Sequence, residues 1–391
     1  MIVGILSRSS VFPEGVAMKR KTLGLAIAAV LGIGMVSTAS ATIFGNNSQK
    51  GSLLIYPRID VQFNYDTLIT LTNDSAGAVR VKCFYATSDP MSTPFSGSAK
   101  SLKHFNDFTI DLTHNQPISW LADDGFAVNN SQKSAGQIAP AFGFYPDGAE
   151  REAGELKCWA VTDDGASERS YNHLFGTVSV LNHKTLQAYE YTAWAFQALS
   201  PTNTVLGTPG ELHLDGVEYD PCPNILLGNF TPTGAPEGPE GPALSPNTQV
   251  TLASCNQDLR QNFTPTVTKL TWTFWNQDEQ ARTGTHKCAD SWYQTDFSDD
   301  TAWPFAQWRN LGTNAAYFRI ETTADTSICT GATTSSYVGI IRESFDLETI
   351  DEETGLPTLR LVRGTNLTGR GVASGVIKYD PSIPDSFKPT K

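Results

Sequence analysis

The stretch LITLTNDSAGAVRVKCFY, residues 68–85, carries the strongest evidence for the class of fold. Residues 68–72 and 79–85 are rich in β-branched and aromatic side chains, which favour strands. From Val79 to Cys83 apolar side chains alternate with basic ones, a period of two that places Cys83 on an inward face. Asn73 and Asp74 mark the turn between the two runs. The segment therefore predicts two β-strands joined by a polar turn.

The same pattern recurs along most of the chain. Further expected strands are residues 53–56, 108–112, 156–161, 176–181, 249–252, 270–275, 317–322, 337–342, 358–363 and 371–379. Charged residues are only 17% and aromatic residues reach 10%, with 32 Gly and 22 Pro, the composition of a folded, turn-rich β protein. Residues 184–199 contain no Gly or Pro, and their pattern suits a helix or a strand.

A Pro- and Gly-rich segment divides the chain near its middle. TPTGAPEGPEGPALSPN, residues 231–247, holds eight Pro or Gly in 17 positions, a density that predicts a surface linker or long loop. The length suggests two domains, which we place at residues 42–230 and 248–391. Residues 68–83 and 270–288 share a strand, an Asn-containing turn and a strand ending in Cys. This faint repeat predicts two tandem antiparallel, immunoglobulin-like β-sandwich domains, with two unrelated β domains as the alternative.

The N-terminus has the pattern of a secretory signal. Residues 18–21 are a basic n-region, residues 23–36 are apolar or small, and a small-x-small pattern ends at Ala41. We predict cleavage after Ala41, with residues 1–17 as an over-extended start. The 14 apolar positions are too few to span a membrane. The expected location is therefore the periplasm or the cell exterior.

Six cysteines fit an oxidising compartment. They are Cys83, Cys158, Cys222, Cys255, Cys288 and Cys329, and six cysteines allow 15 pairings. From their order and the domain division we expect Cys83–Cys158, Cys222–Cys255 and Cys288–Cys329. No Cys-x-x-Cys occurs, which counts against a thioredoxin-like site or a zinc knuckle.

The charge balance excludes one class of partner. The chain carries 28 basic and 40 acidic residues, for a net charge of −12, and residues 1–41 contribute +3 of it. Residues 42–391 therefore carry −15. A nucleic-acid-binding protein needs a basic surface, so we expect no nucleic-acid partner.

Motifs for catalysis or cofactor binding are missing from the sequence. There is no Gly-x-Ser-x-Gly elbow, no Ser-x-x-Lys and no phosphate-binding loop. None of the six histidines has the spacing of a paired metal ligand. Acidic pairs at 123–124, 163–164 and 299–300 and the run 351–353 suit solvated turns, with one calcium site as the alternative. We expect no cofactor and no catalytic residues, although a hydrolase site assembled from scattered residues stays open.

Aromatic residues are the most informative candidates for function. Trp303 and Trp308 begin and end the segment WPFAQW, residues 303–308, in an expected loop, where exposed rings could stack on sugars or anchor an interface. Trp159 and Trp272 lie on expected strands and are assigned to a core. Trp303 and Trp308 are therefore the candidate ligand-binding residues.

Three further patterns support a family resemblance. TNDSAGAVRVKCFY (72–85), GELKCWAV (154–161) and YNHLFGTVSV (171–180) resemble secreted bacterial β-sandwich proteins of unassigned function. A looser likeness is to immunoglobulin-like modules, but Trp159 directly follows its Cys here, whereas in immunoglobulins the Trp lies on a different strand. The resemblance implies a fold and no activity.

Together these features predict a secreted, non-catalytic structural or interaction protein with a protein or glycan partner at the cell surface. The alternative is a carbohydrate-binding protein, or an appendage of a polysaccharide-degrading system, that uses Trp303 and Trp308.

Overall fold

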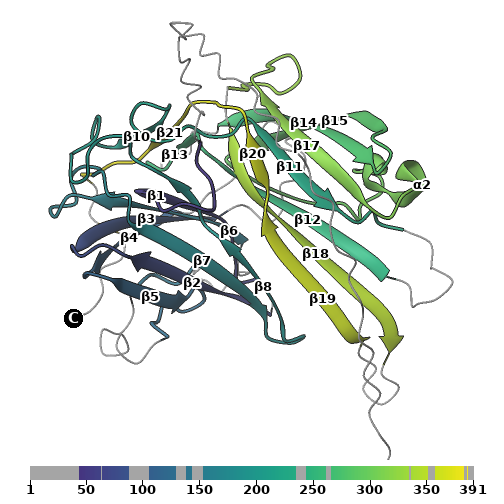
Figure 1. The fold of residues 1–391 in the computed structure, drawn as a ribbon, viewed down its shortest axis with the longest axis horizontal. Helices are drawn as coiled ribbons and strands as arrows, with labels where there is room; N and C mark the ends of the chain where they lie inside the picture. The colour runs from purple at the N-terminus through teal and green to yellow at the C-terminus, as the bar shows by residue number, and fades with distance from the viewer. Residues whose placement is uncertain are drawn as a thin grey trace, which may run out of the picture. The chain divides into compact units, whose positions relative to one another are not determined.

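The computed structural model describes residues 44–62, 64–87, 105–128, 138–142, 153–234, 244–260, 266–333, 336–350, 357–382 and 385. The expected signal sequence, residues 1–41, lies outside them. Residues 42–391 form one compact unit, in which Figure 1 shows strands almost everywhere. Strands make up 57% of the described residues, and the helical elements among these residues are the short η1 (Pro304–Ala306) and α2 (Trp308–Leu311). The expected all-β class is confirmed.

The first half of the chain supplies two sheets. Sheet I has the order β4 (Phe105–Leu112), β3 (Val79–Thr87), β6 (Ala153–Val161), β1 (Leu53–Asp60) and β9 (Trp194–Phe196). Sheet II has the order β5 (Gln116–Leu121), β2 (Tyr65–Asn73), β7 (Leu174–Asn182) and β8 (Gln187–Thr192). The segment 184–199, open between helix and strand, therefore forms β8 and β9.

The remaining strands form a small sheet and a long ladder. Sheet III has the order β10 (Glu211–Leu214), β21 (Gly375–Lys378) and β13 (Gln257–Asp258). The ladder begins with sheet IV, which is β19 (Pro357–Asn366), β18 (Tyr337–Ile350), β12 (Leu244–Ser254) and β16 (Trp292–Asp296). It continues with sheet V, which is β15 (Ala281–Asp290), β14 (Val267–Asn276), β17 (Ala316–Thr323), β11 (Ile225–Phe230) and β20 (Thr368–Arg370). Sheets IV and V are joined through the single residue pair Asp290–Trp292.

The five sheets are arranged as a five-bladed β-propeller, so the expectation of two tandem immunoglobulin-like β-sandwiches is wrong. The expected repeat fails at the level of strand pairing. Strands β2 and β3, which flank the turn after Asn73, lie in different sheets, whereas β14 and β15 pair with each other as a hairpin. Local alternation is the same in both arrangements, because it reports which face of a strand is apolar and not which strand lies beside it.

Two large hydrophobic cores explain why the sheets stay together. One core joins Leu54 of sheet I to Ile69 and Leu71 of sheet II, and these three side chains are fully buried. The other joins the opposite face of sheet I to sheets III, IV and V, and includes Leu53 and Phe318. Core residues thus come from both sides of the Pro- and Gly-rich segment.

Hydrogen bonds also cross between the two halves of the chain. Trp194 Nε1 donates to the Gly339 carbonyl at 3.1 Å, and Trp292 Nε1 donates to the Pro57 carbonyl at 2.7 Å. In the segment 231–247, residues 235–243 lie outside the described part. Its last four residues, 244–247, belong to β12 and pair with β18, so this part is strand rather than linker.

All three expected disulfides are present: Cys83–Cys158, Cys222–Cys255 and Cys288–Cys329. Cys83 and Cys158 are directly paired across β3 and β6, with Cα atoms 4.1 Å apart, and both are fully buried. This disulfide links neighbouring strands of one sheet, whereas the immunoglobulin disulfide joins two sheets. Disulfides of this number are typical of oxidising compartments.

Candidate functional site

Trp303 is buried, and the expectation that it is exposed is wrong. Only 1% of its surface is accessible, and its ring lies 4.8 Å from Trp272 and 5.3 Å from Phe297 between centroids. Its Nε1 donates to Thr295 Oγ1 at 2.6 Å. We call Trp272, Phe297 and Trp303 the closed cluster. The loop before η1 folds inward over the core of sheets IV and V, so Trp303 closes that core. The expected core positions of Trp159 and Trp272 are confirmed, since both are fully buried.

Trp308 is partly exposed and begins α2. Its backbone N–H donates to the Thr233 carbonyl at 2.9 Å, and its Nε1 donates to Asn314 Oδ1 at 2.9 Å. Both N–H groups of Trp308 are therefore hydrogen-bonded within the protein. A ligand-binding role for Trp308 stays a prediction.

A different pair of aromatic residues stacks on the outer face of sheet V. The rings of Trp275 on β14 and Tyr317 on β17 are 5.1 Å apart and within 5° of parallel. The Arg319 guanidinium lies 5.4 Å from the centre of the Trp275 ring and pairs with Glu321 at 3.2 Å. We call Trp275, Tyr317 and Arg319 the open stack, because all three are partly exposed.

Strand alternation explains why this pair faces outward. On β14, Trp272 and Phe274 point into the core, which leaves Trp275 on the opposite face. Trp275 is paired directly with Tyr317, and Tyr317 is paired on its other side with Asn229 of β11. Trp275, Tyr317 and Asn229 therefore form one row across three neighbouring strands.

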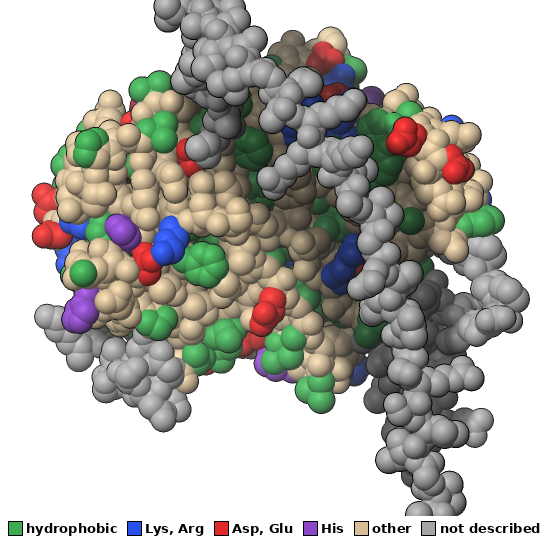
Figure 2. Space-filling model, viewed as in Figure 1, with side chains coloured by type: hydrophobic (Ala, Val, Ile, Leu, Met, Phe, Trp, Pro, Cys, Tyr) green, Lys and Arg blue, Asp and Glu red, His purple; other side chains and the backbone are tan. Residues whose placement is uncertain are grey.

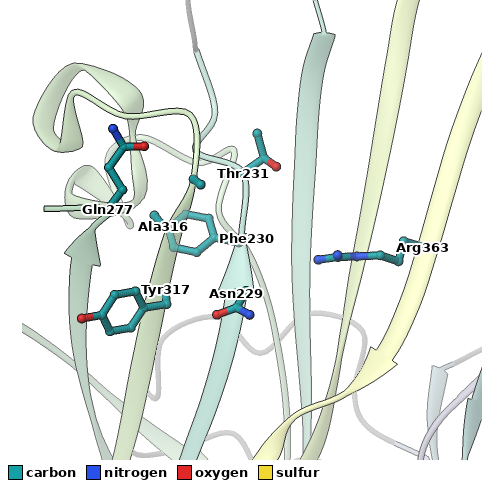
Figure 3. Close-up of a pocket in the computed structure, with 8 residues that line it drawn as sticks. Asn229, Phe230, Thr231, Gln277, Ala316, Tyr317 and Arg363 are labelled. Atoms are coloured by element: carbon teal, nitrogen blue, oxygen red, sulfur yellow. The ribbon is translucent and has the colours of Figure 1, made fainter. Parts of the chain in front are cut away.

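A pocket of about 330 Å³ opens beside this row, which is within the lower range of small-molecule sites. Figure 3 shows the pocket between the ends of β11 and β17 on one side and β19 on the other. Its lining consists of Asn229, Phe230, Thr231, Gln277, Ala315, Ala316, Tyr317 and Arg363.

Buried contacts hold the strand ends around the pocket in place. Asn276 is 4% exposed; its Oδ1 accepts the Gln280 N–H at 2.9 Å, and its Nδ2 donates to the Leu311 carbonyl at 3.2 Å. This anchors the turn that carries Gln277. On β11, a Cβ at Gly228 would lie 2.4 Å from the Phe318 ring, so only glycine allows the two strands to pack here.

The remaining polar side chain of the pocket, Arg363, is tied to a buried carboxylate. Arg363 Nη2 pairs with Glu343 Oε2, and the Glu343 side chain is only 1% exposed. The other oxygen, Glu343 Oε1, accepts the backbone N–H of Thr231 at 2.8 Å. One carboxylate thus positions both the arginine and the backbone at two sides of the pocket.

The lining combines several kinds of polar group with aromatic rings. It offers two aromatic rings, two side-chain amides, two hydroxyl groups and a guanidinium. No Asp, Glu, His or Cys is among the described residues that line it.

A second cluster contains the buried acid Glu168, which is fully inaccessible. Burial raises the pKa of Glu168 to about 7, although Gly210 N–H donates to its Oε1 at 2.9 Å. Tyr379 lies against this carboxyl, and the Tyr379 ring is 4.9 Å from the centre of Trp159. Glu168, Tyr379 and Trp159 are all buried, so we assign this cluster to the core.

Metal ligands do not gather anywhere in the part of the chain that the structure describes: it contains no group of three or more His, Cys, Asp or Glu placed to hold an ion. Of the acidic turns, 351–353 lies outside the described residues. The calcium alternative stays a prediction. Among the described helices, none is long and apolar enough to cross a membrane.

The spacing of Trp272 and Trp275 in the sequence predicts that Trp275 faces outward, although the search for exposed rings in loops overlooked it. Trp272 and Trp275 are three positions apart, an odd spacing that places them on opposite faces of one strand. If Trp272 is core, Trp275 must face outward. Its partner Tyr317 and the basic Arg363, far along the chain, had no comparable signal.

Comparison with known proteins adds no further assignment: no family model matches the chain, and no curated protein matches it.

Proposed function

We propose that this protein is a non-catalytic binding protein outside the cytoplasm whose ligand is a carbohydrate. The pocket beside the open stack supports this proposal: the Tyr317 ring lines it together with the side-chain amides of Asn229 and Gln277. Aromatic rings offer large, rigid contact area for the apolar face of a sugar, and amides hydrogen-bond its hydroxyl groups. The glycan partner expected from sequence is retained, with Tyr317 and Trp275 in place of Trp303.

The proposed location rests on two observations. Three disulfides favour an oxidising compartment, and residues 18–41 have the pattern of a cleaved signal. The acidic net charge opposes binding to nucleic acids. On the face of the molecule drawn in Figure 2, acidic and basic side chains are dispersed, and no basic patch gathers among the described residues.

Isothermal titration with a panel of plant and bacterial oligosaccharides tests the binding role. We expect Tyr317→Ala to weaken binding at least about tenfold, the effect of losing about 1.4 kcal/mol of contact energy. Phe126→Ala is the matched control, because it removes a half-exposed ring outside the pocket lining and should leave affinity within about twofold. Equal losses in the two variants, or no binding of any glycan by the parent protein, would refute the proposal.

Cell fractionation with N-terminal sequencing tests the location. The mature protein is expected to begin at Thr42 and to appear in the periplasm or medium. Recovery of the full-length chain in the cytoplasm with reduced cysteines would contradict this assignment.

A further inference from the structure

The pocket contains one charged group, and that group is positive. Arg363 is the single ionised side chain in the described lining, in a protein whose net charge is −12. Its carboxylate partner, Glu343, is buried and does not line the pocket. Among the described lining residues, a ligand therefore meets a cation and no anion.

Arg363 has donors left over for a ligand. A guanidinium carries five N–H groups in a planar fork, and in the described structure Arg363 pairs with Glu343 through Nη2 alone. The side chain is 55% exposed. Figure 3 shows it extending from β19 toward β11, with its nitrogen atoms toward the side of the pocket that Asn229 and Phe230 form.

Glu343 positions Arg363 and leaves one edge of the guanidinium available to a ligand. Both of its oxygens are occupied, one by Arg363 and one by the Thr231 N–H. Because the ion pair fixes the guanidinium in advance, a second carboxylate could bind the free edge with less loss of side-chain entropy. Hydrogen bonds between Arg and carboxylate are charge-assisted and stronger than those to neutral hydroxyls.

We propose that the pocket selects sugars that carry a carboxylate, such as a uronic acid, with the carboxylate on the free edge of Arg363 and the ring against Tyr317. This inference rests on the proposed carbohydrate function and narrows its ligand class. Asn229 and Gln277 would then bind hydroxyl groups of the same sugar.

The test compares two ligands that differ mainly in the carboxylate, tri-galacturonate and the corresponding galactose trisaccharide, by isothermal titration at moderate salt. We expect the parent protein to bind the acidic trisaccharide at least about tenfold more tightly, as a charge-assisted pair predicts. Equal affinities, or tighter binding of the neutral sugar, would overturn the inference and leave the carbohydrate function standing. Failure of both to bind, with failure of the wider panel, would overturn the function itself.

Variants separate the role of Arg363 from that of the pocket. Arg363→Gln alone leaves the buried Glu343 without its cation, so the double variant Arg363→Gln with Glu343→Gln keeps a neutral acceptor for Thr231. We expect this double variant to lose the preference for the acidic ligand, while neutral binding changes by less than about threefold. Tyr317→Ala should weaken both ligands together. A double variant that folds normally by circular dichroism and retains the acidic preference would refute the assignment to Arg363.

Discussion

The closed cluster and the open stack use the same kinds of side chain and reach opposite outcomes. Trp303 comes from a loop and is 1% exposed, packed 4.8 Å from Trp272. Trp275 comes from a regular strand and is partly exposed, stacked 5.1 Å from Tyr317. The comparison shows that a loop position does not make a tryptophan accessible. A loop that folds over the end of a core buries its ring, and the outer face of a strand exposes one.

The largest expected effect concerns the closed cluster. Trp303→Ala should lower the free energy of unfolding by about 3–5 kcal/mol, because it removes a buried ring and leaves a cavity beside Trp272 and Phe297. Urea unfolding followed by far-UV circular dichroism measures the change. Trp308→Ala is the control and should cost less than about 1 kcal/mol. A loss for Trp303→Ala as small as that of the control would mean that the cluster is not closed in solution.

The carboxyl group of Glu168, buried near Tyr379 and Trp159, extends the contrast to a charged group, because an environment that excludes water disfavours ionisation. The pKa of Glu168 is raised from 4.5 to about 7 by burial, so the folded state favours the protonated acid. Protonated Glu168 makes its full contribution to the free energy of unfolding below the pKa of Glu168 in the unfolded chain. This contribution is lost as pH rises through the higher pKa of Glu168 in the folded protein. This amounts to about 3 kcal/mol between about pH 4.5 and pH 7.5.

The variant Glu168→Gln isolates this contribution from other titrating groups. The parent protein should lose unfolding free energy relative to the variant as pH rises from about 5 to about 8. Parallel urea titrations of both proteins at each pH measure the difference. A difference between them that stays constant across this range would show that Glu168 is hydrated and titrates normally.

The smallest effect is expected in the open stack. Stacked aromatic pairs contribute about 0.5–1.5 kcal/mol beyond the area that they bury. Trp275→Ala, Tyr317→Ala and the double variant form a cycle whose coupling energy should fall within that range when measured by urea unfolding. Coupling near zero would mean that the rings do not stack in solution, whereas a coupling of several kcal/mol would mean that the stack is a closed core.

Local sequence patterns predicted the strands well and their partners poorly. The alternation around Cys83 placed that residue in a strand and in the core, as observed. The similarity of residues 68–83 to 270–288 nevertheless led to a wrong repeat, because β2 and β3 belong to different sheets while β14 and β15 form a hairpin. Strand pairing depends on residues far away in the chain, which the local pattern does not specify.

The candidate pocket could be predicted only in part for the same reason. The odd spacing of Trp272 and Trp275 indicates an outward ring on β14. The neighbouring Tyr317 is 42 positions later, and Arg363 is later still on β19 of another sheet. Their meeting depends on the register of β14 with β17 and on the ion pair between Arg363 and Glu343.

The all-β class and most strand positions could be predicted from the sequence, because side-chain periodicity and turn residues report them locally. The order of the cysteines was enough to predict the three disulfides that the structure contains. The tertiary structure decided the arrangement of the sheets, the burial of Trp303 and the pocket at Arg363. These features arise from contacts between distant segments, whose free energy depends on how faces pack and not on the local composition of any one strand.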